Sequence, residues 1–310
     1  MAAGPATMLE ARPSGAAVSA RRTTGRMVAI VFYFLTLAVA LVFVFPFFWA
    51  VSSSLKQVWE LFNFPPSLLP ETPQWVNYAQ VLQKVPFALW VKNSLLVVAA
   101  VTSGVIVTSS LVAYSFARFQ YRGRNVLFLM TLGTMMLPAQ VTLIPQFILF
   151  NALGWVNTLL PLWVPAWFGG GAFYIFLLRQ FFMALPADLD EAALIDGASY
   201  LQIYWRILLP LCRPALATVA VISFISSWDD FLTPLIYLNS SEKFTVALGL
   251  NFFRNFPEQA GMPMQHLLMA ASVMAIVPCI VLFFVAQRYF VEGIVCLLYT
   301  SDAADDLTRV

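Results

Sequence analysis

The stretch Glu191-Ala-Ala-Leu-Ile-Asp-Gly-Ala-Ser-Tyr-Leu-Gln-Ile-Tyr-Trp-Arg-Ile-Leu-Leu-Pro210 is an amphipathic interruption in an otherwise strongly apolar chain. Acidic residues from Asp188 onward favour a helix start, because negative charge in the first turn complements the helix dipole. Gly197 predicts a break, since glycine accepts a positive φ. Ser199 and Gln202, three residues apart, form a capping-box pattern that starts a second helix. The sequence therefore predicts a helix, a glycine turn and a helix.

The second of these helices carries one apolar stripe. Its members lie three or four residues apart and so share a face: Tyr200, Ile203, Tyr204 and Ile207. An exposed stripe of this kind could fill a groove on another protein. It could equally lie among lipid headgroups as an interfacial helix. The residues alone leave both interpretations open.

The composition around this stretch is that of an integral membrane protein. Of 310 residues, 61% are hydrophobic and 10% charged, and the net charge is only +2, so nucleic-acid binding is not indicated. His266 and the three cysteines show no metal-binding spacing, and we expect no metal site. The first apolar run is long enough to span a bilayer, so it is interpreted as an uncleaved helix rather than a signal peptide.

Gaps between charged residues predict the membrane spans. A span needs roughly 20 apolar residues. The uncharged stretches predict six helices, near residues 27–50, 93–116, 125–149, 158–181, 214–238 and 265–287. The fold class is therefore all-α, with a tail at 1–26 and a six-span transmembrane domain at 27–290. Because an acid at a helix centre costs about 2.5–3.5 kcal/mol, Asp229 and Asp230 must lie near the end of the fifth span or face protein or water.

The distribution of arginine predicts the orientation. Arginines precede the first span, join the second to the third, lie between the fourth and fifth and follow the sixth. By the positive-inside rule both termini and the loop 184–213 are cytoplasmic. The loop 52–91 is then extracytoplasmic. Its proline and tryptophan residues suit a compact cap with little regular structure, which either contacts a soluble partner or simply connects two spans.

Helix-weakening residues mark a candidate substrate pathway. Pro138 and Pro145, and the run Gly169–Gly171, are either sites of binding and gating or ordinary kinks and close helix contacts. The best pathway candidate is Trp228 with Asp229 and Asp230, because an aromatic face and carboxylates suit sugar rings and hydroxyls. Pro138 and Gln140 in the third span are further candidates. The alternative is that the two acids are only a solvated helix end.

The opening stretch resembles the EAA signature of ABC importer permeases. Glu191-Ala-Ala is followed after three residues by Gly197 and after nine more by Ile207-Leu-Leu-Pro210. The resemblance implies the type I ABC importer permease fold. It also implies that the loop 184–213, named the EAA segment below, is a pair of coupling helices that seats in a cleft of an ATP-hydrolysing subunit. The coupling residues it implies are Glu191, Ala192, Ala193, Gly197, Ile207, Leu209 and Pro210.

Three further motifs resemble those of carbohydrate permeases. They are Met136–Pro145 in the third span, Phe224–Ile236 in the fifth, where Asp229 replaces the commoner asparagine, and Ala286–Gly293 after the sixth. The resemblance implies the second permease of a maltose-type importer in the bacterial inner membrane, for a sugar, an oligosaccharide or a polyol. It implies two ATPase subunits, a second permease in a heterodimer and an extracytoplasmic solute-binding protein as partners.

The chain has no P-loop, so it is not expected to be an enzyme or to bind a cofactor. ATP and magnesium would belong to the partner ATPase. A rival class is an ion-coupled secondary carrier that uses Asp229 and Asp230 as its coupling acids. A membrane scaffold would leave the EAA pattern unexplained.

The last residues, 296–310, read CLLYTSDAADDLTRV and do not resemble the ending of that family. The string resembles translated sequencing-adapter read-through, and we expect a non-native tail after Val295. The alternative is a genuine divergent tail.

Overall fold

The computed structural model describes residues 15–254 and 264–306, so most of the predicted tail 1–26 and residues 307–310 lie outside it. No strand occurs in the described ranges. The α-helices are α1 (Gly15–Ser54), α2 (Val76–Lys84), α3 (Phe87–Arg118), α4 (Arg124–Gly133), α5 (Ala139–Ala152), α6 (Leu160–Trp163), α7 (Ala172–Ala184), α8 (Asp188–Ile195), α9 (Tyr200–Ile203), α10 (Leu209–Leu211), α11 (Arg213–Trp228), α12 (Leu232–Tyr237), α13 (Val246–Arg254) and α14 (Gln265–Asp306). Short 3-10 turns are η1 (Trp59–Leu61), η2 (Thr134–Met136), η3 (Val164–Phe168) and η5 (Ser241–Lys243), and η4 (Tyr204–Leu208) is a π-helical turn.

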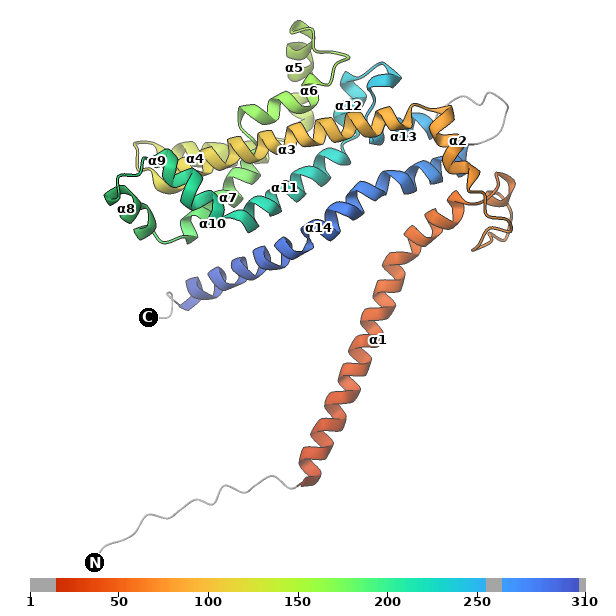
Figure 1. The fold of residues 1–310 in the computed structure, drawn as a ribbon, viewed down its shortest axis with the longest axis horizontal. Helices are drawn as coiled ribbons and strands as arrows, with labels where there is room; N and C mark the ends of the chain where they lie inside the picture. The colour runs from red at the N-terminus through yellow and green to blue at the C-terminus, as the bar shows by residue number, and fades with distance from the viewer. Residues whose placement is uncertain (1–14, 255–263, 307–310) are drawn as a thin grey trace, which may run out of the picture.

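The helix α3 organises the bundle (Figure 1). It packs against α7, α11 and η3, and both clusters of buried side chains form on it. One cluster joins Trp90 of α3 to Trp228 of α11 and Leu267 of α14. The other joins Tyr114 of α3 to Phe182 of α7 and to the EAA segment. One continuous helix therefore links the two cores.

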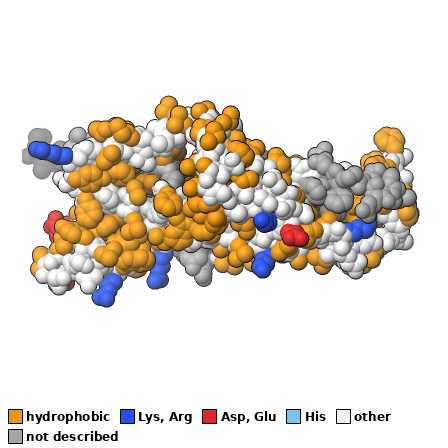
Figure 2. Space-filling view, turned by 90° about the horizontal axis from the view of Figure 1, so that it is seen from above, with side chains coloured by type: hydrophobic (Ala, Val, Ile, Leu, Met, Phe, Trp, Pro, Cys, Tyr) orange, Lys and Arg blue, Asp and Glu red, His pale blue; other side chains and the backbone are white. Residues whose placement is uncertain are grey.

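Four helices of the described residues are long and apolar enough to cross a membrane. They are Ala29–Ser54 of α1, Phe87–Arg118, Leu160–Ala184 and Gln265–Gln287 of α14, which match four predicted spans. The number reaches six only if each of two bent helix pairs counts as one span. Hydrophobic side chains also cover much of the face shown in Figure 2, as expected for a surface in contact with lipid or other subunits.

The third predicted span, 125–149, is a bent pair of helices, which is one span only if its two halves are counted together. Its two halves, Arg124–Met136 and Gln140–Ala152, are bent by 98°. Pro138 precedes α5 with φ −60° and ψ 134°, and a proline cannot continue the hydrogen-bond ladder of the preceding helix. Pro145 lies inside α5 without ending it. The bend therefore lies at the first proline.

The fifth predicted span, 214–238, is also interrupted. α11 ends at Trp228, and α12 begins at Leu232 after a short break. The 16 residues of α11 reach about 24 Å, less than the roughly 30 Å of a bilayer core. Asp229 and Asp230 occupy the break, which confirms that they lie at a helix end.

The loop between α1 and α3 is more regular than expected, because it contains η1 and the nine-residue helix α2. It is compact: the buried Lys56 ammonium lies 4.5 Å from the centre of the Trp49 ring, and the Asn77 amide donates to the carbonyls of Ser54 and Lys56. Figure 1 places α2 at the opposite end of the bundle from α8 and α9.

The run Gly169–Gly171 makes a close helix contact. All three glycines have positive φ, and Gly170 lies against α3 so closely that a Cβ would overlap the Ser109 hydroxyl and lie 2.6 Å from Thr108 Oγ1. Close contact was one of the two open interpretations of this run. The glycine is needed here both for its φ of 63° and for the absence of a side chain.

Gly170→Ala is expected to destabilise the chain by about 2 kcal/mol or more, because overpacking adds to backbone strain. The melting temperature of the detergent-purified protein should fall by several degrees. The control is Gly133→Ala, where a Cβ meets nothing within 4 Å and φ is −57°. An unchanged melting temperature in Gly170→Ala would contradict the close contact.

Candidate functional site

The EAA segment folds as its sequence predicts. α8 begins at Asp188, and Gly197 forms the turn with φ 83°. In the capping box the backbone amide of Ser199 donates to Gln202 Oε1 at 2.7 Å, and the backbone amide of Gln202 donates to Ser199 Oγ at 3.4 Å. The helical stretch Tyr200–Leu211 then meets α11 at 78°. The segment therefore turns sharply away from the axis of α11.

The predicted exposed stripe is largely wrong, because its central residues face the chain's own core. Ile203 and Tyr204 are 0% and 1% exposed, and Tyr200 alone of the four is well exposed. An amphipathic pattern shows that a helix buries one face, but it does not show what covers that face. Here α3, α7 and α11 cover it.

Another set of apolar side chains forms the outer surface of the segment. The turn and second helix expose Ile195 (86%), Tyr200, Leu201 and Trp205. We name these four residues the outer face. Among the predicted coupling residues, Glu191, Ala192, Gly197 and Pro210 are exposed, and Ile207 and Leu209 are half-buried. Ala193 is buried inside the chain, so it supports this surface from beneath.

Three side chains of α3 hold the EAA segment. The Ser110 and Tyr204 hydroxyls are 2.6 Å apart, and the Tyr114 hydroxyl donates to the carbonyl of Tyr200 at 3.1 Å. Arg118 Nε lies 2.9 Å from Asp190 Oδ2 in an ion pair. Ser110, Tyr114 and Arg118 are spaced by four residues, so they share one face of the helix. We call them the α3 ladder.

The ion pair of the ladder is largely screened from water, with the two side chains 10% and 16% exposed. Burial raises the pKa of the Asp190 carboxyl above its ordinary value, and the Arg118 charge opposes that rise. Arg118 also donates to the carbonyl of Leu185 at 3.0 Å. The arginine therefore holds both the turn that leads into α8 and the first turn of that helix.

The other end of α3 is also held by hydrogen bonds. Trp90 Nε1 donates to the carbonyl of Ser241 at 2.7 Å, and the Asn93 amide donates to the carbonyl of Glu242 at 2.8 Å. Ser94 Oγ accepts from the amide of Val246 at 2.8 Å. The residues 241–246 are thus fixed to α3 as the EAA segment is, at the opposite end of the same helix.

The pathway candidates lie in two segments of the chain and have different surroundings. Trp228 is buried and stacks on Phe224 at 5.8 Å, so its ring belongs to the core. Asp230 Oδ1 accepts from the amide of Thr233 at 3.1 Å and so caps the start of α12. Asp229 is exposed at the helix break, and Pro138 and Gln140 are exposed at the start of α5.

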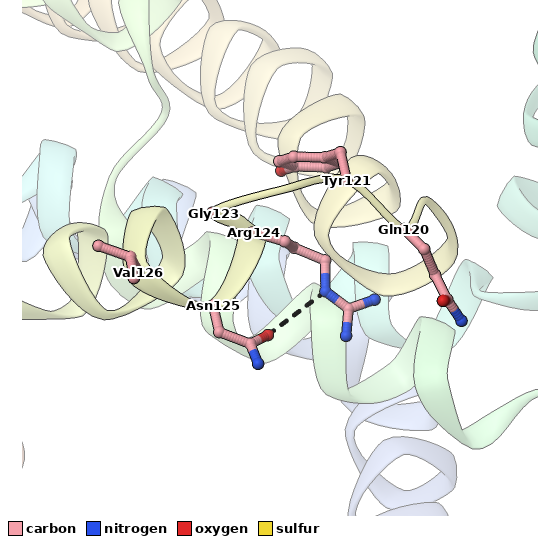
Figure 3. A pocket seen from close by; sticks show the side chains of 6 residues that line it. All are labelled: Gln120, Tyr121, Gly123, Arg124, Asn125 and Val126. Atoms are coloured by element: carbon pink, nitrogen blue, oxygen red, sulfur yellow. Dashed lines mark hydrogen bonds between the residues drawn. The ribbon is translucent and has the colours of Figure 1, made fainter.

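A cavity of about 280 Å³ lies at the turn between α3 and α4 (Figure 3). Its lining residues are Gln120, Tyr121, Gly123, Arg124, Asn125 and Val126. None of the five pathway candidates lines it. Sequence reasoning used the arginines here only to assign orientation, so it missed this cavity.

The described residues form a helical bundle with membrane-length apolar helices and a helix–turn–helix fixed to α3, an arrangement that fits a membrane transport permease. Residues 105–295 match the family model described as "Binding-protein-dependent transport system inner membrane component". The chain belongs to this family.

Similar proteins agree with that assignment. The chain is 33% identical to the sn-glycerol-3-phosphate transport system permease protein UgpE of Yersinia enterocolitica, over 82% of this chain and 92% of that one. It is 32% identical to the arabinooligosaccharides transport system permease protein AraQ of Bacillus subtilis, over 86% and 93%. It is also 32% identical to the trehalose/maltose transport system permease protein MalG of Thermococcus litoralis, over 82% and 91%.

A solved structure of a bacterial ABC transporter involved in the import of the acidic polysaccharide alginate contains a similar chain, with a TM-score of 0.76 and 27% identity. The match covers 86% of this chain and 98% of that one. The fold is that of a type I ABC importer permease. The ion-coupled carrier gains no support from any of these likenesses.

Proposed function

We propose that this chain is one of two different permease subunits of a bacterial ABC importer for a carbohydrate or polyol, and that separate subunits hydrolyse ATP. The names of the similar proteins refer to oligosaccharides, disaccharides, a phosphorylated polyol and a polysaccharide. Each of these compounds carries several hydroxyl groups. The observation that carries the proposal is the EAA segment, which combines an exposed outer face with a fixed attachment to α3.

The outer face and Gly197 would form the docking surface for the ATPase, together with Glu191, Ala192, Ile207, Leu209 and Pro210. A cluster of exposed aromatic and aliphatic side chains suits the centre of a protein interface. Glu191 adds a charged contact beside it. The tagged chain should therefore retain its ATPase through purification in detergent. If no ATPase is retained, the EAA segment is instead a helix pair that lies among the lipid headgroups.

The α3 ladder would carry the movement of the ATPase into the membrane. The EAA segment is joined covalently to α7 and α11, but its polar attachments through the ladder are to α3. Because α3 also fixes residues 241–246, it would link the coupling surface to the far side of the bundle. Ser110, Tyr114 and Arg118 are positioning residues in this proposal.

The positive-inside rule supports placing both termini and the EAA segment in the cytoplasm. The second permease would cover α1, whose apolar window has no buried residue in this chain (Figure 1). The solute-binding protein would meet the loop between α1 and α3, which exposes Trp59, Phe64 and Trp75. Membrane lipid would cover the remaining apolar faces. ATP and magnesium would bind to the ATPase, and this chain would bind neither cofactor nor nucleic acid.

Asp230→Ala is expected to reduce uptake while the ATPase still co-purifies. Two causes can be separated, because Asp230 both carries a charge and caps α12. Loss of the cap alone costs about 1 kcal/mol. Asp230→Asn keeps a capping oxygen and removes the charge. Uptake into proteoliposomes should fall severalfold in both variants if the carboxylate faces the substrate pathway. Normal uptake in Asp230→Asn would leave this aspartate with a capping role only.

A further inference from the structure

We propose that the cavity between α3 and α4 binds the phosphate headgroup of an anionic phospholipid in the cytoplasmic leaflet. Polar and apolar groups both line the cavity; the polar side chains are Gln120, Tyr121, Arg124 and Asn125, and none of its six lining residues is acidic. Its volume of about 280 Å³ lies at the lower end of the roughly 300–1,000 Å³ typical of ligand pockets, which suits a headgroup rather than a whole lipid.

The positive charge in this cavity is not neutralised by the described part of the chain. Arg124 donates only to neutral acceptors, the carbonyl of Phe119 at 3.2 Å and the amide oxygen of Asn125 at 3.4 Å. Figure 3 shows the second of these contacts. The ion pair found among the described residues joins Arg118 to Asp190, so it leaves Arg124 without a carboxylate. A guanidinium with remaining donors suits a phosphate oxygen.

Two more arginines add to this charge. Arg122 is exposed in the same turn. The Arg179 guanidinium lies 4.1 Å from the centre of the Phe128 ring on α4, and its Nε donates to the carbonyl of Phe116. Neither arginine forms an ion pair within the described ranges. Three cations that form no ion pair within the described ranges favour an anionic ligand.

The surroundings point to a lipid rather than to free phosphate. α4 has no buried residue, and it exposes Val126, Leu127, Leu129 and Met130 in the turns that follow the cavity. Acyl chains could lie along this apolar face while the headgroup occupies the cavity. In the orientation proposed above, which this inference requires, the cavity lies at the cytoplasmic membrane surface, where basic pockets bind anionic headgroups.

The test uses the full-length chain purified in detergent and mixed with either dioleoyl phosphatidylglycerol or dioleoyl phosphatidylcholine. Native mass spectrometry measures how much of each lipid is retained. Wild type should prefer the phosphatidylglycerol, and Arg122→Gln/Arg124→Gln should lose about 30-fold in affinity for it, since each basic residue contributes roughly fivefold. Arg206→Gln/Arg213→Gln removes the same charge from other exposed cytoplasmic positions and should keep the preference.

Three results would overturn the proposal. Equal retention of the two lipids would show that no anionic headgroup is selected. An equal loss in both double variants would show that only general positive charge attracts the lipid. Displacement of the phosphatidylglycerol by millimolar inorganic phosphate would assign the cavity to a free anion. None of these readouts depends on the ATPase or on uptake, so failure here leaves the proposed transport function standing.

Discussion

Replacing Gly197 with proline is expected to abolish retention of the ATPase, with a loss of at least tenfold in the co-purified subunit. Gly197 has φ 83°, and the proline ring fixes φ near −65°, so the turn between α8 and α9 cannot form. A Cβ at this position would meet nothing within 4 Å, so the effect comes from the backbone and not from a clash with the core. The measurement is the ATPase-to-permease ratio after affinity purification.

The matched control is Gly154→Pro. Gly154 also has a positive φ, 68°, and a Cβ there would also meet nothing within 4 Å, but this glycine lies in the loop after α5. The control variant should keep its ATPase. Glu191→Lys provides a second arm, because it reverses one exposed charge without changing the turn, and it should weaken retention. Full retention in both Gly197→Pro and Glu191→Lys would exclude the EAA segment as the docking surface.

Arg118→Gln is expected to uncouple the transporter, so that the ATPase stays bound and active while transport per ATP falls about tenfold. The substitution leaves the Asp190 carboxylate screened from water without its cation, at a cost of about 1–3 kcal/mol. That strain weakens the attachment of α8 to α3 but does not alter the outer face. The measurement is substrate uptake and ATP hydrolysis in the same proteoliposomes.

The double variant Arg118→Gln/Asp190→Asn removes the unpaired charge and should recover part of the lost coupling. The two single variants and the double variant form a cycle that isolates the pair. If Arg118→Gln takes up as much substrate per ATP as wild type, the ion pair plays no part in coupling. Loss of the ATPase itself would show that Arg118 supports docking and not transmission.

The same pair gives the expected pH dependence. Without Arg118, burial alone acts on Asp190, so the pKa of its carboxyl rises further above the ordinary value of about 3.9. A raised pKa means that the folded state favours the protonated carboxyl. The contribution of Asp190 to the stability of Arg118→Gln is therefore greatest below about pH 4 and is lost as pH rises through the raised pKa. Its melting temperature should therefore lag behind wild type more at neutral pH than near about pH 4, whereas the double variant should show no such trend.

Prediction from the sequence succeeded for features that depend on residues close together in the chain. The start of α8 at Asp188, the turn at Gly197 and the box of Ser199 with Gln202 depend on residues within one or two helical turns, and all were predicted. The inward direction of Tyr204 was not, because its partner Ser110 is 94 residues away. The four-residue spacing of Ser110, Tyr114 and Arg118 on an apolar helix was the available signal for the ladder.

The bends in the third and fifth predicted spans show the same limit of prediction from sequence. Pro138 was identified as a weak point, but its residue type does not determine whether the helix kinks slightly or turns by 98°. The two aspartates were placed at a helix end from their insertion cost, yet the capping of α12 by Asp230 required the backbone beyond it. Trp228 was grouped with them because an aromatic face and carboxylates suit sugars, but the residue type does not show that its ring packs on Phe224 in the core.

Because α3 is held near both of its ends, a change in its tilt moves the two ends relative to each other. α3 has 32 residues and so extends about 48 Å, with the EAA segment held near one end and residues 241–246 near the other. A tilt of only about 5° over that length moves one end relative to the other by about 4 Å. A small rotation of a subunit on one side of the bilayer would therefore reach the opposite surface as a displacement of atomic size, without any helix having to unfold or slide.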